Sequence, residues 1–373
     1  ILIILTYDLV LFGTFLTRSG VLSSVHAFAE SEIGPMFFLF IGFTFVTSIA
    51  LLIYRWADLK SETEMKSMLS REALFLLNNL FFLSILVVSF WGVIFPLLSE
   101  LFTGSKVTVG PPFYERATGP IWGALMLLMG VAPLSAWGHS TIKTLGRAIW
   151  KPALFALIAP IFAYVSGITN WIALSGFTLV ALVITVTIYE FWRGARARSR
   201  KSDENFITAL WRLTKRHRRR YGGYIIHISM VLMAIGIIGI ELFQTETQKH
   251  IAVNDEIELA GYTLHYDKLD QFRHNDGRYI TRAEISISKD GEDLGSIAPR
   301  FDIYSDGQPM TIPGVRSTLV DDIYVVLINW EGITPESTPF KVYHNPLVKW
   351  VWIGGYVFIL GILIAAWPEK ELE

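Results

Sequence analysis

About eight apolar runs in this sequence are long enough to cross a lipid bilayer. They lie at about residues 1–17, 35–54, 77–98, 119–136, 152–168, 171–191, 224–243 and 347–367. A membrane-spanning helix needs about 20 mostly apolar residues to cross the hydrocarbon core. Hydrophobic residues make up 52% of the chain and the mean hydropathy is +0.44, which is too apolar for a soluble chain of 373 residues. The sequence therefore predicts an all-α polytopic membrane bundle of about eight transmembrane helices.

The stretch at 245–346 differs because polar and apolar residues alternate in short segments. Alternation occurs at 256–266 and 283–288, a turn sequence follows at 289–291, and another strand-like segment covers 323–330. Such period-two patterns between turn residues predict β-strands. We expect a transmembrane region at 1–243, a small extracytoplasmic β domain at 244–346, and a final helix with its tail at 347–373.

Lysine and arginine gather in alternate segments between the apolar runs. The basic segments contain Arg55, Lys66, Arg71, Lys143, Arg147, Lys151, the dense run at 193–220 and Lys370. The opposite short loops carry only Arg18, Lys106 and Arg116. Because basic loops stay on the cytoplasmic side, we expect a bacterial inner-membrane protein with a cytoplasmic C-terminus and His26 outside. The cluster at 215–220 is expected to anchor on anionic lipid rather than to bind nucleic acid.

His227 is a polar residue inside the apolar run at 224–243. Ionisable side chains at membrane depth are costly and usually have a partner, and neutral imidazole is a common ligand of haem iron. Polar residues also join helices to one another. Its neighbours at one-turn spacing, Gly223, Met230, Val231 and Ala234, form a mostly small face that suits either a flat macrocycle or a tightly packed helix. From His227 alone, both a role in helix packing and a role as a ligand of haem iron stay open.

The chain contains no cysteine. This excludes a thiolate nucleophile, an iron–sulfur cluster and covalent attachment of haem to this chain. The glycine-rich phosphate loop, the zinc-binding HExxH pair and the nucleophilic GxSxG turn are also missing from the sequence. No catalytic residue can be assigned from these patterns.

Several short strings follow one another along the chain. They are GTFLTRSGVL at 13–22, SVHAFA at 24–29, SRE at 70–72, LNN at 77–79, VGPPF at 109–113, LMGVAPL at 128–134, IYVVL at 323–327, PLVKW at 346–350 and GG at 354–355. In this order they resemble the CcmF family of cytochrome c haem lyase subunits, over essentially the whole chain. The family also carries a tryptophan-rich segment, roughly WGGxWFWDP, which is not found here and which we expect upstream of Ile1. The family uses two intramembrane and two extracytoplasmic histidines, and this chain shows one of each, His227 and His26.

The resemblance implies a function in cytochrome c maturation. Such a protein receives haem from a periplasmic haem chaperone and promotes its thioether attachment to the CxxCH motifs of apocytochrome c. It works with other maturation subunits, including thiol-handling proteins, in the lipid bilayer. The resemblance also implies a resident haem b whose iron is bound by His227, and transient ligation of the delivered haem iron by His26. Arg18 would lie near the propionates of the delivered haem; its alternative role is anchoring to lipid phosphate.

Two other functions are kept as alternatives: a membrane transporter of haem or a lipid-like substrate, and a non-catalytic assembly scaffold. Transporters tend to show repeated halves and paired broken helices, and neither is visible in the sequence. His139 and His217 are expected in cytoplasmic loops. The histidines at 250, 265, 274 and 344 lack the spacing of a zinc site. Asp8, inside the first apolar run, is either a packing partner or part of a polar path.

Overall fold

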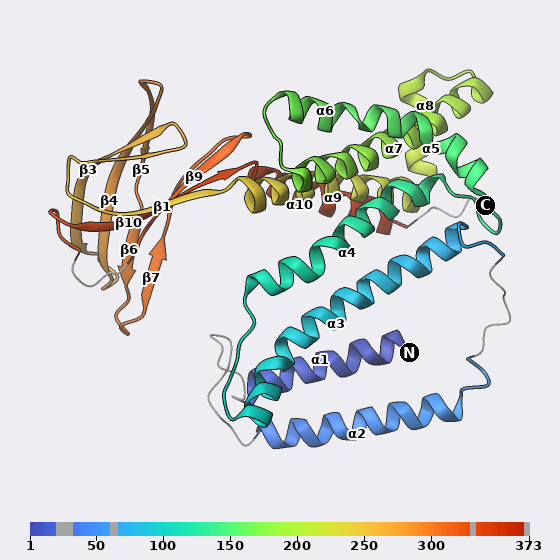
Figure 1. Cartoon of the computed structure of the whole chain (residues 1–373), viewed down its shortest axis with the longest axis horizontal. Helices are drawn as coiled ribbons and strands as arrows, with labels where there is room; N and C mark the ends of the chain where they lie inside the picture. The colour runs from blue at the N-terminus through green and yellow to red at the C-terminus, as the bar shows by residue number, and fades with distance from the viewer. Residues whose placement is uncertain (20–32, 60–65, 329–332, 369–373) are drawn as a thin grey trace. The chain divides into compact units, whose positions relative to one another are not determined.

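The computed structural model of the chain describes residues 1–19, 33–59, 66–328 and 333–368. Within these residues, seven helices are long and apolar enough to cross a membrane. They cover Ile33–Tyr54, Arg71–Thr103, Pro111–Leu134, Ile142–Val165, Trp171–Ser202, Arg218–Phe243 and Lys349–Ala366. The first apolar run forms helix α1 (Leu2–Arg18), which has only 17 residues. The expected polytopic helical protein with a β domain is therefore confirmed (Figure 1).

The segment Ile1–Ile121 is one of two compact units. It contains α1, α2 (Ile33–Tyr54), α3 (Arg71–Thr103) and the first part of α4 (Pro111–Val131). Aromatic rings join α1 to its neighbours: Phe12 lies 5.7 Å from Phe90 of α3, and Phe15 lies 5.8 Å from Phe38 of α2, between ring centroids. Helix α3 begins at Ser70, whose hydroxyl accepts the backbone N–H of Ala73 and so satisfies one donor of the first turn.

The second unit, Trp122–Glu373, is built around a long central helix. Its helical elements after α4 are the short 3-10 helix η1 (Ala132–Leu134), α5 (Ile142–Ala156), α6 (Ile158–Val165), α7 (Trp171–Ser202), α8 (Phe206–Arg216), α9 (Arg218–Phe243) and α10 (Lys349–Ala366). Asn170 caps α7 by accepting the backbone N–H of Ile172. Val183 and Val186 of α7 are fully buried, the first against Val231 of α9 and the second against α5. Helix α7 therefore packs against both α5 and α9.

The helix ends differ from the apolar runs of the sequence. Lys143 and Arg147, expected in a loop, lie in α5, and α7 continues to Ser202 although its apolar run ends at 191. Helix α8 was not expected at all. In these helical segments charged residues interrupt the apolar ones, so a pattern based on apolar length does not detect them.

Helices α9 and α10 pack directly through glycine. A Cβ atom added to any of four glycines would lie 2.7–3.0 Å from a backbone nitrogen of the other helix; these are Gly222 and Gly236 of α9, and Gly354 and Gly361 of α10. Real Cβ atoms do not approach so closely. Small residues at such contacts let two helix backbones approach within a membrane.

We expect Gly354→Ala to destabilise the purified protein by about 1–3 kcal/mol, as overpacking of a tight interface typically does. The added methyl group would meet the backbone of Met233 and Ser229. The matched control is Gly355→Ala, one residue along, where a Cβ atom meets nothing within 4 Å among the described residues. That change should be neutral or slightly stabilising, because alanine favours a helix over glycine by about 1 kcal/mol. Equal shifts of the thermal unfolding midpoint in both variants would contradict the prediction.

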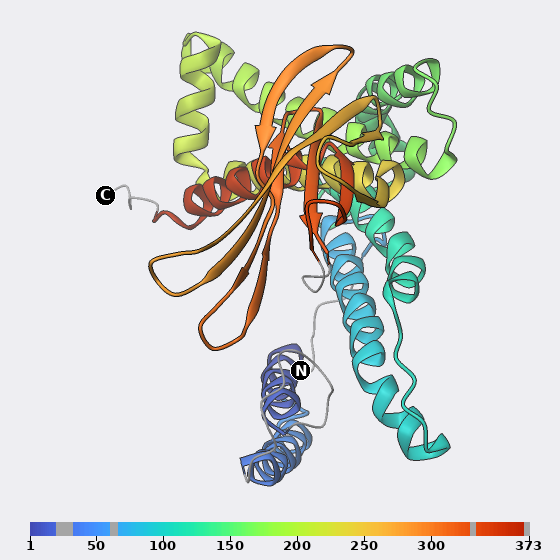
Figure 2. The same cartoon turned by 90° about the vertical axis from the view of Figure 1, so that its left-hand side faces the viewer.

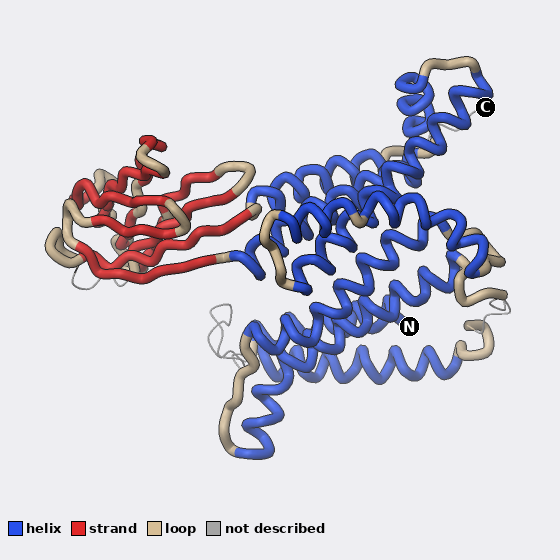
Figure 3. Tube along the Cα trace, turned by 45° about the horizontal axis from the view of Figure 1, so that its top comes forward, coloured by secondary structure: helices blue, strands red, loops and turns tan. Residues whose placement is uncertain are grey.

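Between α9 and α10 lies a two-sheet β-sandwich. One sheet has the strand order β1-β10-β9-β8, and the other has the order β2-β3-β4-β6-β7 with β5 paired to β4. Figure 2 turns the strands toward the viewer, and Figure 3 shows them in red beside the blue helices. The strands are β1 (Thr245–Ile251), β2 (Glu256–Leu259), β3 (Tyr262–Arg273), β4 (Tyr279–Lys289), β5 (Glu292–Ile297), β6 (Arg300–Ile303), β7 (Pro309–Ile312), β8 (Gly314–Ser317), β9 (Asp321–Leu327) and β10 (Thr338–Pro346).

Alternating side chains from the two sheets form the sandwich core. Leu264 and Ile285 from one sheet and Val325 and Phe340 from the other are at most 2% exposed. The predicted segment at 256–266 is in fact two strands, because Ala260 and Gly261 form a turn between β2 and β3. Both residues have positive φ angles, 55° and 79°, as a two-residue hairpin turn requires.

Candidate functional site

His227 lies on α9 and is partly buried. Its Nδ1 atom is buried, and no described residue offers it a hydrogen-bond partner. The ring of Tyr224, one turn earlier, lies 6.1 Å from the imidazole between centroids. A buried polar atom is normally paired, so an unpaired one calls for an explanation such as a ligand or an ion.

The residues around His227 have different surroundings. At about 100° of rotation per residue, His227 points to the same side of α9 as Ala234 and Ile238, which pack with α7. Gly223 and Met230 point between that face and the face that meets α10. Val231 and Ala234 pack against α7. A Cβ atom at Gly223 would meet nothing within 4 Å among the described residues. The predicted small face is therefore partly used for packing, while space remains beside His227 at Gly223.

A buried carboxylate lies near His227 at the interface of α7 and α9. The side chain of Glu190 is fully buried, and its Oε2 accepts hydrogen bonds from Arg220 Nη2 at 2.8 Å and from the Tyr224 hydroxyl at 3.1 Å. Arg193 Nη2 lies 2.6 Å from Oε1, an ion-pair distance without hydrogen-bond geometry. Arg220 Nε also donates to Tyr224 at 3.1 Å. We refer to Glu190, Arg193, Arg220 and Tyr224 as the Glu190 cluster.

The sequence predicts only a lipid-anchoring role for Arg220 and no role for Glu190, so it does not predict the Glu190 cluster. An acidic residue near the end of the apolar run at 171–191 was the available signal. The cluster fixes the start of α9, and thereby Tyr224 and His227, against α7.

The two other predicted haem-binding residues lie at the opposite end of the sequence. Arg18 is the last residue of α1. His26 lies outside the described residues. Their roles therefore stay predictions.

Among the described residues, no group of three or more histidine and carboxylate side chains is placed to hold a metal ion. His139 lies between η1 and α5, and His217 lies between α8 and α9. In the sandwich, His265 and His274 each lie beside one carboxylate, at 2.9 and 3.0 Å. The Oδ1 atom of Asp8 is buried, with no hydrogen-bond partner among the described residues.

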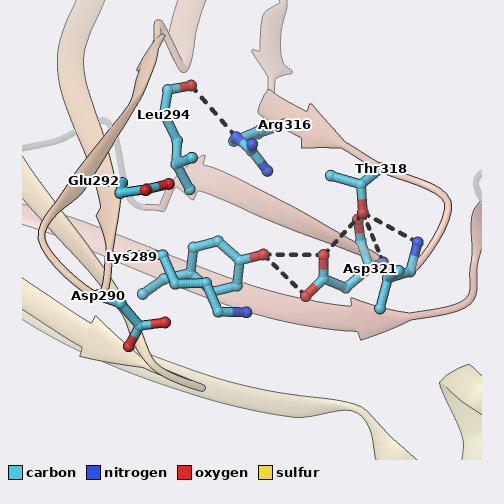
Figure 4. Close-up of a pocket in the computed structure, with 9 residues that line it drawn as sticks. Lys289, Asp290, Glu292, Leu294, Arg316, Thr318 and Asp321 are labelled. Atoms are coloured by element: carbon cyan, nitrogen blue, oxygen red, sulfur yellow. Dashed lines mark hydrogen bonds between the residues drawn. The ribbon is translucent and has the colours of Figure 1, made fainter.

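Asp321 is the centre of a polar network at the end of β9 that faces α10 (Figure 4). Its carboxylate accepts hydrogen bonds from the Tyr262 hydroxyl, at 3.0 Å to each oxygen, and lies 3.0 Å from His344 Nε2. Burial raises the pKa of Asp321, but hydrogen bonds from His344, Tyr262 and Thr318 outweigh it and leave the pKa below its ordinary value. The network fixes the turn that precedes β9.

Comparisons with known proteins cover both the sandwich and the whole chain. Residues 242–346 match the family described as the CcmF C-terminal beta-sandwich. The chain is 30% identical to the cytochrome c-type biogenesis protein CcmF of Pseudomonas aeruginosa, over 99% of this chain and 55% of that protein. It is 29% identical to CcmF of Pseudomonas fluorescens, over 99% of this chain and 54% of that protein. The chain thus spans about half the length of the curated relatives it matches.

A solved structure has the same fold. The structure named Cytochrome c Heme Lyase CcmF matches with a TM-score of 0.74 and 23% identity, over 98% of this chain and 54% of that one. At this identity the likeness supports the fold, and the sequence matches support the family. The chain is therefore a relative of the CcmF cytochrome c-type biogenesis proteins, corresponding to about half of their length.

Proposed function

We propose that this chain is part of a haem lyase of cytochrome c maturation. In this proposal the whole protein receives haem, its substrate, from a periplasmic haem chaperone and promotes its attachment to apocytochrome c. The single observation that carries the proposal is the buried Nδ1 of His227 in a membrane helix, which has no hydrogen-bond partner among the described residues and lies beside the open space at Gly223. The names of the curated relatives, cytochrome c-type biogenesis proteins, support the same function.

A resident haem b fits the surroundings of His227. The Nδ1 atom of the imidazole has no hydrogen-bond partner among the described residues, and Gly223 leaves room one turn earlier on α9. His227 would bind the iron of that haem. A haem bound there would supply a one-electron couple for keeping the substrate iron reduced.

The residues of this chain would act mainly by positioning. Packing of α9 on α7 and α10 fixes the direction of His227, and the Glu190 cluster fixes the start of the same helix. Thioether formation adds each cysteine thiol of the apocytochrome across a vinyl group of the substrate haem, with sulfur bound to one carbon and hydrogen to the other. This addition is redox-neutral and requires aligned reactants rather than an enzymatic nucleophile.

The proposed location is a bacterial inner membrane, with the C-terminus in the cytoplasm and the sandwich outside. The support is the alternation of basic and non-basic segments along the chain. In this orientation Arg18 and His26 lie on the outer side, where the haem chaperone, apocytochrome c and the thiol-handling subunits meet. Arg18 would pair with the propionates of the delivered haem and His26 would bind its iron transiently.

The proposal is tested with the whole protein in sealed vesicles, with the haem-loaded chaperone and an apocytochrome that carries a CxxCH motif. Covalent haem should appear on the apocytochrome, detected by haem-dependent peroxidase staining after denaturing electrophoresis. A CxxCH motif with both cysteines changed to serine is the control and should remain unstained. Haem movement across the vesicle without covalent product would favour a transporter, and apocytochrome bound without covalent haem would favour a scaffold.

We expect His26→Ala to lower cytochrome c maturation and to leave the resident haem spectrum unchanged. The reason is that His26 is proposed to bind only the delivered haem. Added imidazole should restore maturation, because a small free ligand can replace a missing iron bond but not a packing contact. His139→Ala serves as the control and should mature cytochrome normally. Normal maturation by His26→Ala without imidazole would contradict the assignment.

A further inference from the structure

The turn between β8 and β9 is held at the beginning of α10. The backbone carbonyl of Val320 accepts the N–H of Leu347 at 2.8 Å, and the carbonyl of Leu319 accepts the indole N–H of Trp350 at 2.9 Å. Trp350 lies in the first turn of α10, a helix apolar enough to span a membrane. The turn therefore lies at the level where α10 enters the bilayer.

The end of α9 lies at the same level. The side-chain amide of Gln244, directly after α9, donates to Asn345 near the end of β10 at 2.6 Å. A Cβ atom at Gly236, in the last two turns of α9, would contact Leu347 and Val351. Two membrane helices thus have their ends beside the β8–β9 turn, which makes the interfacial layer the environment of this turn.

The tip of the turn is apolar and exposed. Val320 is 69% exposed and Leu319 is 55% exposed, more than any other large hydrophobic side chain in the described part of the sandwich. Adjacent exposed apolar residues of this kind mark a contact with a protein or a membrane. Because the turn lies where α10 enters the bilayer, the contact we infer is with the membrane rather than with a protein.

The turn is also rigid. The Thr318 hydroxyl accepts the backbone N–H groups of Val320 and Asp321 at 3.1 and 3.0 Å, and the Thr318 N–H donates to the Asp321 carbonyl at 2.9 Å. Asp321 in turn accepts hydrogen bonds from the Tyr262 hydroxyl (Figure 4) and lies 3.0 Å from His344 Nε2. The two apolar side chains are therefore presented without a loss of backbone freedom on binding.

We propose that the β8–β9 turn inserts Leu319 and Val320 into the interfacial layer of the bilayer and so orients the sandwich on the membrane surface. The cavity behind the turn contains Lys289 and Arg316 together with Asp290, Glu292 and Asp321. Because these charges largely cancel, the contact depends on the two apolar side chains. Trp350 next to them is the residue type that anchors proteins at this depth.

The test uses single-cysteine variants of the whole protein in which any cysteine outside this chain is first replaced by serine; this chain itself contains none. Val320→Cys in the whole protein is labelled with a polarity-sensitive fluorophore and reconstituted into phosphatidylcholine vesicles that contain nitroxide-labelled lipid. The matched control is Val315→Cys, an exposed valine on β8 that pairs with Tyr324, three residues from the membrane end of β9. Leu319→Cys provides a second position in the turn.

The label at position 320 should lose fluorescence to the lipid-borne nitroxide and resist quenching by iodide in water. The label at 315 should behave in the opposite way. Quenching of both positions by iodide would overturn the proposal. Protection of position 320 from iodide and nitroxide alike would also overturn it, because the turn would then be covered by protein. Equally strong nitroxide quenching at positions 315 and 320 would also overturn it, because the membrane contact would then not be specific to the turn.

Discussion

Replacement of His227 by alanine is expected to abolish the low-spin haem spectrum of the purified whole protein. The imidazole is the proposed iron ligand, and alanine supplies no replacement donor in that part of α9. The change removes a buried nitrogen that has no hydrogen-bond partner among the described residues, so it breaks no internal bond. The measurement is the absorption spectrum of the reduced protein, compared at equal protein concentration with the parent.

Two controls separate loss of the ligand from loss of the fold. His217→Ala changes a histidine between α8 and α9 and should keep the parent spectrum. The circular dichroism of His227→Ala should match that of the parent, because the helix packs through other residues. An unchanged haem spectrum in the folded His227→Ala variant would refute the assignment.

The second large effect is expected for the Glu190 cluster. The double variant Arg193→Gln/Arg220→Gln should lower stability by about 3–5 kcal/mol, the typical cost of leaving a buried charge without its partner. The Glu190 side chain is fully buried, whereas the two arginine side chains are about half exposed, at 47% and 48%. Removal of the arginines thus leaves a carboxylate that water cannot reach. The measurement is the thermal unfolding midpoint of the purified protein.

The matched control for this prediction is Glu190→Gln. It removes the buried charge and keeps the size of the side chain, and the two arginines can turn toward solvent. Its loss of stability should be clearly smaller than that of the double variant. The reverse order would mean that the carboxylate is solvated or paired in another way.

The sequence predicts the type of the elements better than their number or their ends. Long apolar runs identify the membrane helices because a lipid environment requires about 20 apolar residues. The polar continuation of α7 to Ser202 and the short helix α8 carry no such signal. Alternation identifies segments of β2, β3, β4 and β9, but it continues through the turn at Ala260 and Gly261, so β2 and β3 read as one strand.

The candidate site was only partly predictable for a similar reason. His227 was identified because it interrupts an apolar run, which is a local property. The partnership of Glu190 with Arg220 joins residues 30 positions apart on two helices. It depends on how α7 packs on α9, and no local pattern contains that information.

The sandwich is connected to the membrane helices by two neighbouring strands. Strands β1 and β10 pair from Thr245 with His344 to Ile251 with Thr338, and they continue from α9 and into α10. A slide of α9 along α10 by one residue would move it by about 1.5 Å. In a β-strand, side chains return to the same face of the sheet only every two residues, or about 6.8 Å. No small sliding step satisfies both spacings. A slide of the helix that carries His227 along α10 would therefore break the pairing of β1 with β10.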